Sequence, residues 1–340
     1  MTGILREHIT DRAAWMGTEV GTKDAFAFAL TPRHLAAIDE IMAEVERHRL
    51  TPETIERAHF DHPDLNDDLA RLYGEVKDRR GIVLLRNLPV DKYGLERIQT
   101  VWRGLGTHFG IGQSQSVLGE LVGAVADFTD SDPHARAYHN KQELSLHTDL
   151  CDMIGMLGIR KSETGGVSSY ASVAAIHNRI LATRPDLLAP LYRGFHYHRR
   201  GEEQPGDAPI TPHMVPVLAC LEGKVSARYV RAYIDSAMRD MGVDDAELRQ
   251  ALDVFDQAAR DVAISFTIER GEATIINNHS VLHARTAFQD PPDPARKRLL
   301  YRLWLTRPGF RPVPESFTIY GAGEGIARVE GKTPSYVGIA

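Results

Sequence analysis

The chain of 340 residues contains only two cysteines, Cys151 and Cys220. Two thiols are too few for a disulfide framework, so a reducing compartment is the simplest setting. No apolar stretch approaches the roughly 20 residues that a transmembrane helix needs. Residues 1–8 include charged side chains and lack the apolar core of a signal peptide. These absences predict a cytoplasmic protein without a membrane partner.

The chain also lacks an excess of basic residues. Its 40 lysines and arginines are outnumbered by 46 acidic residues, which gives a formal net charge of −6. Nucleic-acid binders usually carry a basic face, so this class of function is disfavoured. The hydrophobic fraction of 43% is enough for a sizeable core. We therefore expect a small-molecule partner, and the composition leaves open whether the chain forms a homo-oligomer.

Hydrophobic periodicity predicts a few helices among many short strands. Apolar residues recur at helical spacing in four segments: 32–49, 65–79, 93–106 and 244–261. The apolar run 81–86 is typical of a buried strand. Other extended segments, separated by Gly and Pro, are 121–128, 154–160, 167–174, 214–218, 227–233, 262–268, 273–277 and 298–306. Many short strands favour a sandwich or barrel, so the expected fold class is mainly β with helical additions.

The chain shows no internal repeat, low-complexity tract or linker. We expect one domain over residues 1–340, with a core at about 80–310 and a helical N-terminal extension. The polar, Pro- and Gly-rich segment 199–212 is predicted to be a surface loop and a candidate lid.

His147-Thr148-Asp149 is the first candidate for chemistry. Side chains alternate between the faces of a strand, so His147 and Asp149 project the same way if this segment is extended. Two imidazoles and one carboxylate form the facial triad that holds non-haem Fe(II) and leaves coordination positions open. A lone His-x-Asp arises by chance in many proteins, and a surface acid beside a hydrogen-bonded histidine explains it better on that evidence alone. A third ligand is needed.

The second half of the chain offers candidates for that ligand. A strand, a Gly turn and a second strand over 268–278 precede His279 and His283. A further strand would then place Arg298, Arg302 and Trp304 on one face. Two arginines beside a tryptophan in a central strand are costly to bury without anionic partners, which favours an inward-facing pair near the histidines. The alternative is an edge strand whose arginines are solvated.

Together these motifs resemble the taurine dioxygenase (TauD/TfdA)/clavaminate synthase-like family of Fe(II)- and 2-oxoglutarate-dependent oxygenases. The resemblance implies a double-stranded β-helix, or jelly roll, with iron at one open end. It covers most of the chain and rests on the order and spacing of several motifs: Leu146-His147-Thr148-Asp149, Thr164-Gly165-Gly166-Val167-Ser168, Gly271-Glu272, Asn277-Asn278, His283 and Arg298-x-x-x-Arg302.

For the metal, the resemblance implies that His147, Asp149 and His283 are the iron ligands and the catalytic centre. His279 competes for the third position, but the family places the ligand a short spacer after the Asn pair, which selects His283. His279 would then bond within its own loop. The family often has Asp-Asn-Arg where this chain has Asn-Asn-His at 277–279, so no arginine is carried over there.

For the ligands, the resemblance implies that Ser168 and Arg298 hold the distal carboxylate of the cosubstrate 2-oxoglutarate, and that O2 takes the last iron position. Arg302 would meet a substrate anion or the cosubstrate. Gln113 or Gln115, in a polar segment before the metal motif, would contact substrate, unless that segment is only a structural loop. The expected reaction hydroxylates a C–H bond of a small, anionic or amino-acid-like substrate and releases succinate and CO2. Halogenating relatives have a small residue in place of the metal-binding carboxylate, which supports hydroxylation here.

Two other classes of function remain open. A zinc hydrolase could use the same three ligands around an activated water, although it has no need of a keto-acid clamp formed by Ser168 and Arg298. A catalytically silent jelly-roll binding protein is the other alternative, and the intact ligand set weighs against it.

Overall fold

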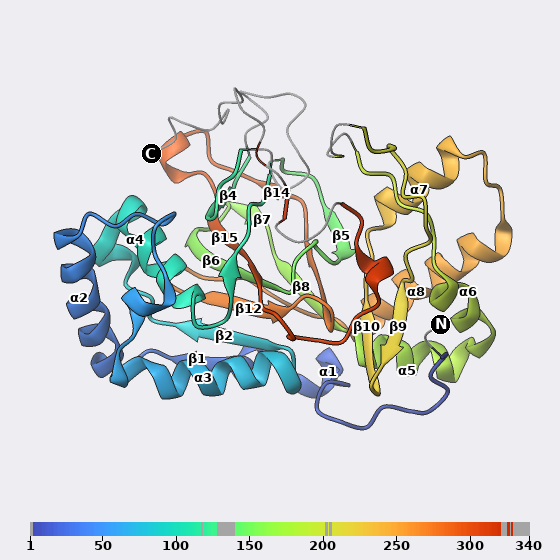
Figure 1. Cartoon of the computed structure of the whole chain (residues 1–340), viewed down its shortest axis with the longest axis horizontal. Coiled ribbons are helices and arrows are strands. Elements are labelled where there is room, and N and C mark those ends of the chain that lie inside the picture. Colours follow the sequence, from blue (N-terminus) through green and yellow to red (C-terminus); the bar gives the residue numbers. More distant parts are fainter. Residues whose placement is uncertain are drawn as a thin grey trace.

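The computed structural model describes residues 3–116, 118–127, 140–200, 203, 206–320, 325–326 and 328. Two β-sheets form the centre of the described molecule, with helices on either side (Figure 1). The larger sheet has the order β1-β2-β12-β6-β15-β3, and β4 also pairs with β15. Its strands are β1 (Ala27–Ala29), β2 (Ile82–Arg86), β3 (Ile111–Gly112), β4 (Gly123–Val125), β6 (Met153–Arg160), β12 (Ala273–Asn277) and β15 (Leu299–Thr306).

The smaller sheet carries the metal motif and has the order β11-β8-β13-β5. Neighbouring strands in it are antiparallel. Two short antiparallel pairs, β9 with β10 and β7 with β14, lie outside both sheets. The strands named here are β5 (Leu144–His147), β7 (Thr164–Gly165), β8 (Ser168–Ser172), β9 (Leu218–Leu221), β10 (Lys224–Ala227), β11 (Ile264–Phe266), β13 (Val281–Arg285) and β14 (Phe288–Gln289).

Strand β2 shows how the sequence specifies the layers. Ile82 and Leu84 belong to an apolar cluster that includes residues of both sheets, whereas Val83 and Leu85 belong to a cluster shared with the helices. Because alternate side chains enter alternate faces, a strand covered on both sides needs an unbroken apolar run. The run at 82–85 therefore places β2 in the middle of the fold.

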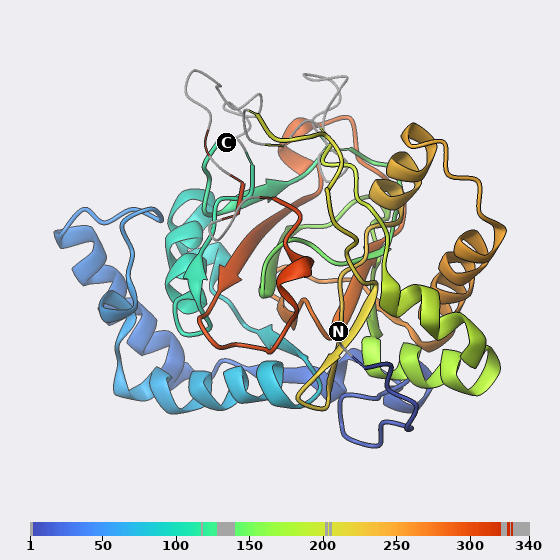
Figure 2. The ribbon, with the colours of Figure 1, turned by 45° about the vertical axis from the view of Figure 1, so that its right-hand side comes forward.

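The helices form two groups (Figures 1 and 2). Helices α3 and α4 contact the larger sheet, with α2 against α3, while α5 and α8 contact the smaller sheet. The two groups appear at opposite ends of the view in Figure 1. The helices are α1 (Gly17–Val20), α2 (Pro32–Arg47), α3 (Pro63–Asp78), α4 (Val90–Gly106), α5 (Val173–Thr183), α6 (Leu188–Arg193), α7 (Arg231–Asp240) and α8 (Ala246–Val262), with short 3-10 turns at Lys23–Phe26, Arg57–Phe60, Pro185–Leu187, Pro294–Arg296 and Glu315–Phe317.

The four predicted helices are confirmed as α2, α3, α4 and α8. The last of these helices begins at a side-chain cap, because the Asp245 carboxylate accepts hydrogen bonds from the backbone N–H groups of Glu247 and Leu248. The predicted strand at 81–86 is β2, and the segments at 154–160, 273–277 and 298–306 contain β6, β12 and β15.

Three extended segments were predicted wrongly in part. Segment 227–233 was expected to be a strand, but helix α7 begins at Arg231, where Ile234, Ala237 and Met238 bury one helical face. Segment 167–174 ends as a strand at Ser172, whose hydroxyl caps helix α5. Only the last residue of segment 214–218 lies in a strand. Tertiary packing outweighed the β propensity of these short runs.

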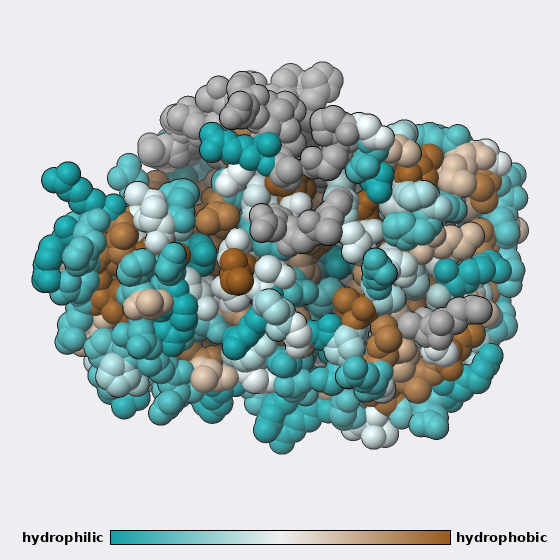
Figure 3. All heavy atoms as spheres, in the orientation of Figure 1, coloured by the Kyte–Doolittle hydropathy of each residue, from teal (hydrophilic) through white to brown (hydrophobic). Residues whose placement is uncertain are grey.

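The surface has few exposed large apolar side chains. The face shown in Figure 3 is mostly hydrophilic, with apolar residues in separate groups. Among the described residues, no helix is both long and apolar enough to cross a bilayer.

Candidate active site

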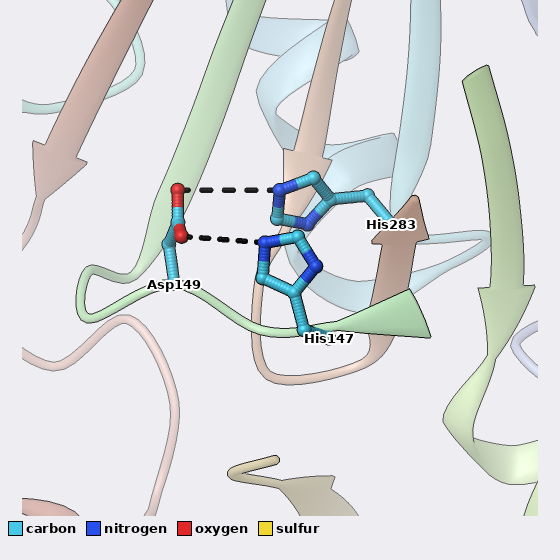
Figure 4. A group of neighbouring side chains, drawn as sticks. All are labelled: His147, Asp149 and His283. Atoms are coloured by element: carbon cyan, nitrogen blue, oxygen red, sulfur yellow. Dashed lines mark ion pairs between the residues drawn. The ribbon is translucent and has the colours of Figure 1, made fainter. Parts of the chain in front are cut away.

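Three residues that could bind a metal ion meet at the smaller sheet. His147 ends β5, His283 lies opposite it on β13, and Asp149 follows β5 by two residues. His147 Nε2 is 3.6 Å from Asp149 Oδ1, and His283 Nε2 is 4.0 Å from Asp149 Oδ2 (Figure 4). One potential ligand atom from each residue lies within 4.8 Å of the others. Two histidine nitrogens and one carboxylate oxygen are the donor set of a facial triad, which binds one side of a metal ion and leaves the other positions open.

A hydrogen bond orients His147, and burial favours the neutral form of His283. The Nδ1–H of His147 donates to the Ser145 carbonyl across 2.7 Å, so the Nε2 lone pair is the one that faces Asp149. Burial, reinforced by the neighbouring His147, lowers the pKa of His283 to about 3. A metal binds the neutral form of imidazole, and this environment favours that form.

The carboxylate of Asp149 is held from its other side by strand β15. The Trp304 indole N–H donates to Asp149 Oδ2 across 2.8 Å, and Nη1 of Arg302 lies 3.3 Å from the same oxygen. Burial alone would raise the pKa of Asp149, but the positive charge of Arg302 holds it below its ordinary range. Asp149 is therefore ionised, as a metal ligand must be.

The buried side chain of Asn278 fixes the backbone that carries Asp149. Its Oδ1 accepts a bond of 2.9 Å from the Asp149 N–H, and its Nδ2 donates to the carbonyls of Asp149 and Cys151, each across 2.7 Å. An amide side chain supplies the donors and acceptor for all three bonds. The Asn pair in the sequence motif thus contributes its second member to the shape of the metal loop.

His279 lies outside the triad. Its Nε2 is 2.9 Å from Asp152 Oδ1, while Asp152 Oδ2 accepts from the Thr306 hydroxyl and the Arg307 N–H. This network ties the loop before β13 to the end of β15. The side chain of His279 therefore bonds to the segment between β5 and β6, and the expectation that it would bond within its own loop is wrong.

A cavity of about 710 Å³ opens beside the triad between the two sheets. Strand β15 contributes Leu300, Arg302 and Trp304 to its wall, and Arg298 lines it just before the strand begins. The predicted inward-facing arginines are confirmed. The segment before β5 and the start of helix α7 also line it. One side of the cavity is therefore cationic, with Arg298 and Arg302. Its mouth is polar and carries both charges; the described residues there include Asn140, Gln142, Glu143, Arg200, Arg231 and Asp235.

Ser168 and Arg298 lie at the same part of this cavity. Both line it, and both are buried, with Arg298 4% exposed. Within the described part of the chain, Nη1 of Arg298 has no hydrogen-bond partner. Gly166 makes room for this guanidinium, because a Cβ there would stand 3.0 Å from Arg298 Nε. A buried, partly unpaired cation beside a hydroxyl fits a carboxylate ligand.

The glutamine expectation needs correction. Gln113 is not among the cavity-lining residues, whereas Gln115 is. The Gln115 Oε1 accepts from Arg302 Nε across 2.7 Å, and its Nε2 donates to the Arg302 carbonyl. These bonds to β15 draw Gln115 toward the cavity, while the backbone N–H of Gln113 pairs with the carbonyl of Trp304.

The candidate lid at 199–212 is described only in part, because residues 201, 202, 204 and 205 lie outside the described residues. Arg200 lines the cavity and has a positive φ of 60°. Such backbone strain in a non-glycine residue is often found at functional sites.

Sequence reasoning missed Arg285, which also lines the cavity. It lies two residues after His283 on β13, so strand alternation would have placed both side chains on one face.

The family comparison identifies the class of protein. Residues 46–304 match the model of the family described as taurine catabolism dioxygenase TauD, TfdA family. This match covers most of the chain, and the chain belongs to that family. It is thus an Fe(II)- and 2-oxoglutarate-dependent oxygenase. The predicted family and enzyme class are confirmed.

Similar proteins span nearly the whole chain. FR-33289 synthase of Streptomyces rubellomurinus is 26% identical over 332 residues, which cover 95% of this chain and 97% of the relative. The taurine hydroxylase-like protein SAT17 of Stachybotrys chartarum is 23% identical and covers 87% and 79% of the two chains. Sequence identities of 26% and 23% are low enough that this chain can differ from both relatives in its substrate.

Solved structures share the fold. Asparagine oxygenase, in complex with Fe(II), 2S,3S-3-hydroxyasparagine and succinate, superposes with a TM-score of 0.67 at 18% identity over 87% of this chain and 100% of its own. The non-haem iron oxygenase OrfP, in complex with Fe and alpha-ketoglutaric acid, gives a TM-score of 0.59 at 18% identity over 82% and 93%. The predicted jelly-roll fold with helical additions is confirmed.

Proposed function

We propose that this chain hydroxylates a C–H bond of a small anionic or amino-acid-like substrate, using Fe(II) held by His147, Asp149 and His283. The observation that carries the proposal is the position of this triad in the same cavity as the buried, partly unpaired Arg298. The three donors suit Fe(II), and the arginine suits the far carboxylate of 2-oxoglutarate. A zinc hydrolase would need the triad but not the arginine.

The chain's own residues would position the reactants. Arg298 and Ser168 would hold the distal carboxylate of 2-oxoglutarate, which directs its keto-acid end toward the triad. Trp304 and Arg302 would keep Asp149 ionised and oriented. Bound Fe(II) would couple the decarboxylation of 2-oxoglutarate by O2, with release of succinate and CO2, to oxidation of the substrate. The cavity walls would shield this chemistry from water.

The polar mouth of the cavity supports a charged or zwitterionic substrate. Arg200 and Glu143 line it, so groups of either sign are available.

Arg302 already contacts Asp149 and Gln115, so we propose that it acts mainly on the metal side of the cavity. The structural neighbours include complexes with hydroxylated asparagine and arginine, and the family description names taurine. Amino acids and sulfonates are therefore the first substrates to test.

The test is substrate-triggered release of succinate. Enzyme loaded anaerobically with Fe(II) and 2-oxoglutarate is exposed to O2 with amino acids, sulfonates and phosphonates in turn. His147→Ala should reduce turnover to background, while His48→Ala, which changes an exposed histidine beyond α2, should not. Full 2-oxoglutarate turnover by His147→Ala would contradict the metal assignment. Activity without O2 and 2-oxoglutarate would favour a hydrolase.

The cytoplasmic location, the single-domain organisation and the oligomeric state stay predictions. The two described cysteines are free thiols, which supports a reducing compartment.

A further inference from the structure

Arg285 belongs to the cavity wall that carries the metal ligand His283. The two residues are two positions apart on β13, and Arg285 lies opposite Ser168 on β8. All three line the cavity. The sheet register thus places an arginine beside the serine that we assign to the cosubstrate.

The guanidinium of Arg285 is buried and only partly used. Its exposure is 5%, and its Nη2 donates to the backbone carbonyls of Asn140 and Gln142. Its Nε and Nη1 have no hydrogen-bond partner among the residues that the structure describes. Unpaired N–H groups of a buried cation are expensive, so a ligand that accepts from them would stabilise the site.

Arg285 and Arg298 both lie against the same aromatic ring. The guanidinium carbon of Arg285 is 4.8 Å from the centroid of Phe288, and that of Arg298 is 5.1 Å from it. Burial together with the charge of Arg285 lowers the pKa of Arg298 to about 9. The two cations repel one another in a region of low polarity, and an anion beside them would relieve this cost.

Two carboxylates, those of Asp127 and Asp290, act on Arg285 through space, and Asp290 acts on Arg298 as well. The Asp290 Oδ1 accepts from the backbone N–H of Arg298, and its Oδ2 has no hydrogen-bond partner in the described structure. Burial raises the pKa of Asp290. Among the described residues, neither Arg285 nor Arg298 forms an ion pair with a carboxylate within 4.0 Å.

We propose that Arg285 is a second binding residue for the distal carboxylate of the keto-acid cosubstrate, acting with Arg298 and Ser168. This inference rests on the proposed function. Two guanidiniums and a hydroxyl would make the site selective for keto acids with a carboxylate at the far end. The bonds from Nη2 to the backbone would keep Arg285 in place when the cosubstrate leaves.

The test compares two keto acids that differ at the far end. The affinities for 2-oxoglutarate and for 2-oxopentanoate, which has the same carbon chain without the distal carboxylate, are measured by calorimetry on anaerobic Fe(II) enzyme. Arg285→Gln should weaken 2-oxoglutarate binding roughly 10- to 100-fold, as expected for loss of a charged hydrogen bond, and leave 2-oxopentanoate binding unchanged. Arg285→Lys should restore part of the loss because it keeps the charge.

Arg311→Gln is the matched control. Arg311 is a half-buried arginine that also donates to a backbone carbonyl, that of Val225, but it is not among the cavity-lining residues. Its replacement should change neither keto-acid affinity. Arg298→Gln provides the reference for a selective loss of 2-oxoglutarate.

Two outcomes would overturn the assignment of Arg285 alone. One is wild-type affinity for 2-oxoglutarate in Arg285→Gln, and the other is an equal loss for both keto acids, which would indicate a structural role. Failure of the wild-type enzyme to bind 2-oxoglutarate would instead overturn the proposed function, and this inference with it.

Discussion

The indole N–H of Trp304 donates a hydrogen bond of 2.8 Å to Oδ2 of Asp149. The other carboxylate oxygen, Oδ1, is the one that lies 3.6 Å from His147 Nε2. Both oxygens thus face the candidate metal site, since Oδ2 is also 4.0 Å from His283 Nε2, and Oδ2 is held in addition by strand β15. Partners behind a metal ligand commonly set its orientation and the affinity for the metal.

Trp304→Phe should weaken Fe(II) binding by roughly 10- to 100-fold, because it removes this bond while keeping an aromatic ring. Anaerobic titration with Fe(II) measures the effect. Trp102→Phe is the control, since Trp102 donates to the carbonyl of Tyr301 and packs in the helix-side cluster. Equal metal affinities for Trp304→Phe and the wild type would show that the indole does not orient Asp149.

Gly166→Ala should weaken 2-oxoglutarate binding at least about 10-fold without changing Fe(II) affinity. A Cβ at this position would stand 2.6 Å from Ser162 Oγ and 3.0 Å from Arg298 Nε, so the guanidinium must move. Gly242→Ala has a similar positive φ but nothing within 4 Å of the added Cβ, and it separates backbone strain from the clash. A normal cosubstrate affinity in Gly166→Ala would mean that Arg298 tolerates displacement.

Asn278→Ala should lower both stability and metal affinity. Loss of the amide leaves the buried N–H and carbonyl of Asp149 without these partners, which costs at least about 2 kcal/mol of the free energy of unfolding. Urea unfolding and Fe(II) titration report the two effects. Asn277→Ala, whose side chain bonds to Lys77 and His279, should destabilise the protein while metal affinity is kept. The same metal affinity in both variants would contradict the role of Asn278.

Acid should destabilise the protein partly through His108. Burial lowers the pKa of this histidine to about 4, while its Nε2–H donates to the Phe60 carbonyl across 2.9 Å. The unfolded chain takes up a proton near pH 6.5 and the folded chain does not, so this stability is lost as the pH falls from 6.5 toward 4. For this group alone the loss from pH 7 to pH 5 is about 2 kcal/mol.

His108→Gln keeps a donor for Phe60 and removes the titration. Its free energy of unfolding, measured in urea, should therefore fall less between pH 7 and pH 5 than that of the wild type. An identical pH dependence for the two proteins would show that His108 does not control this transition.

Metal and cosubstrate should stabilise the fold by mass action. At 100 times its dissociation constant, a ligand specific for the folded state adds about 2.7 kcal/mol. Treatment with a chelator should lower the melting temperature, and Fe(II) followed by 2-oxoglutarate should restore it under anaerobic conditions. Asp149→Ala should abolish the metal response, whereas a full response in that variant would place the metal elsewhere.

The sequence alone predicted those parts of the fold and site that depend on the pattern of neighbouring residues. The apolar run of β2 predicted a strand covered on both faces, and the alternation in β15 predicted that Arg298 and Arg302 face inward. The motif order predicted the family. Helix α7 was missed because a short segment with aromatic and β-branched residues suits either structure until its burial is known.

The sequence by itself determined the donor types of His147 and Asp149 and the family to which the chain belongs. Only the tertiary structure brought His283 opposite His147, separated His279 from the group, and placed Arg285 and Arg298 against the same Phe288 ring. The physical reason is that donor chemistry is a property of each residue, whereas proximity between distant residues depends on strand register and on the packing of two sheets.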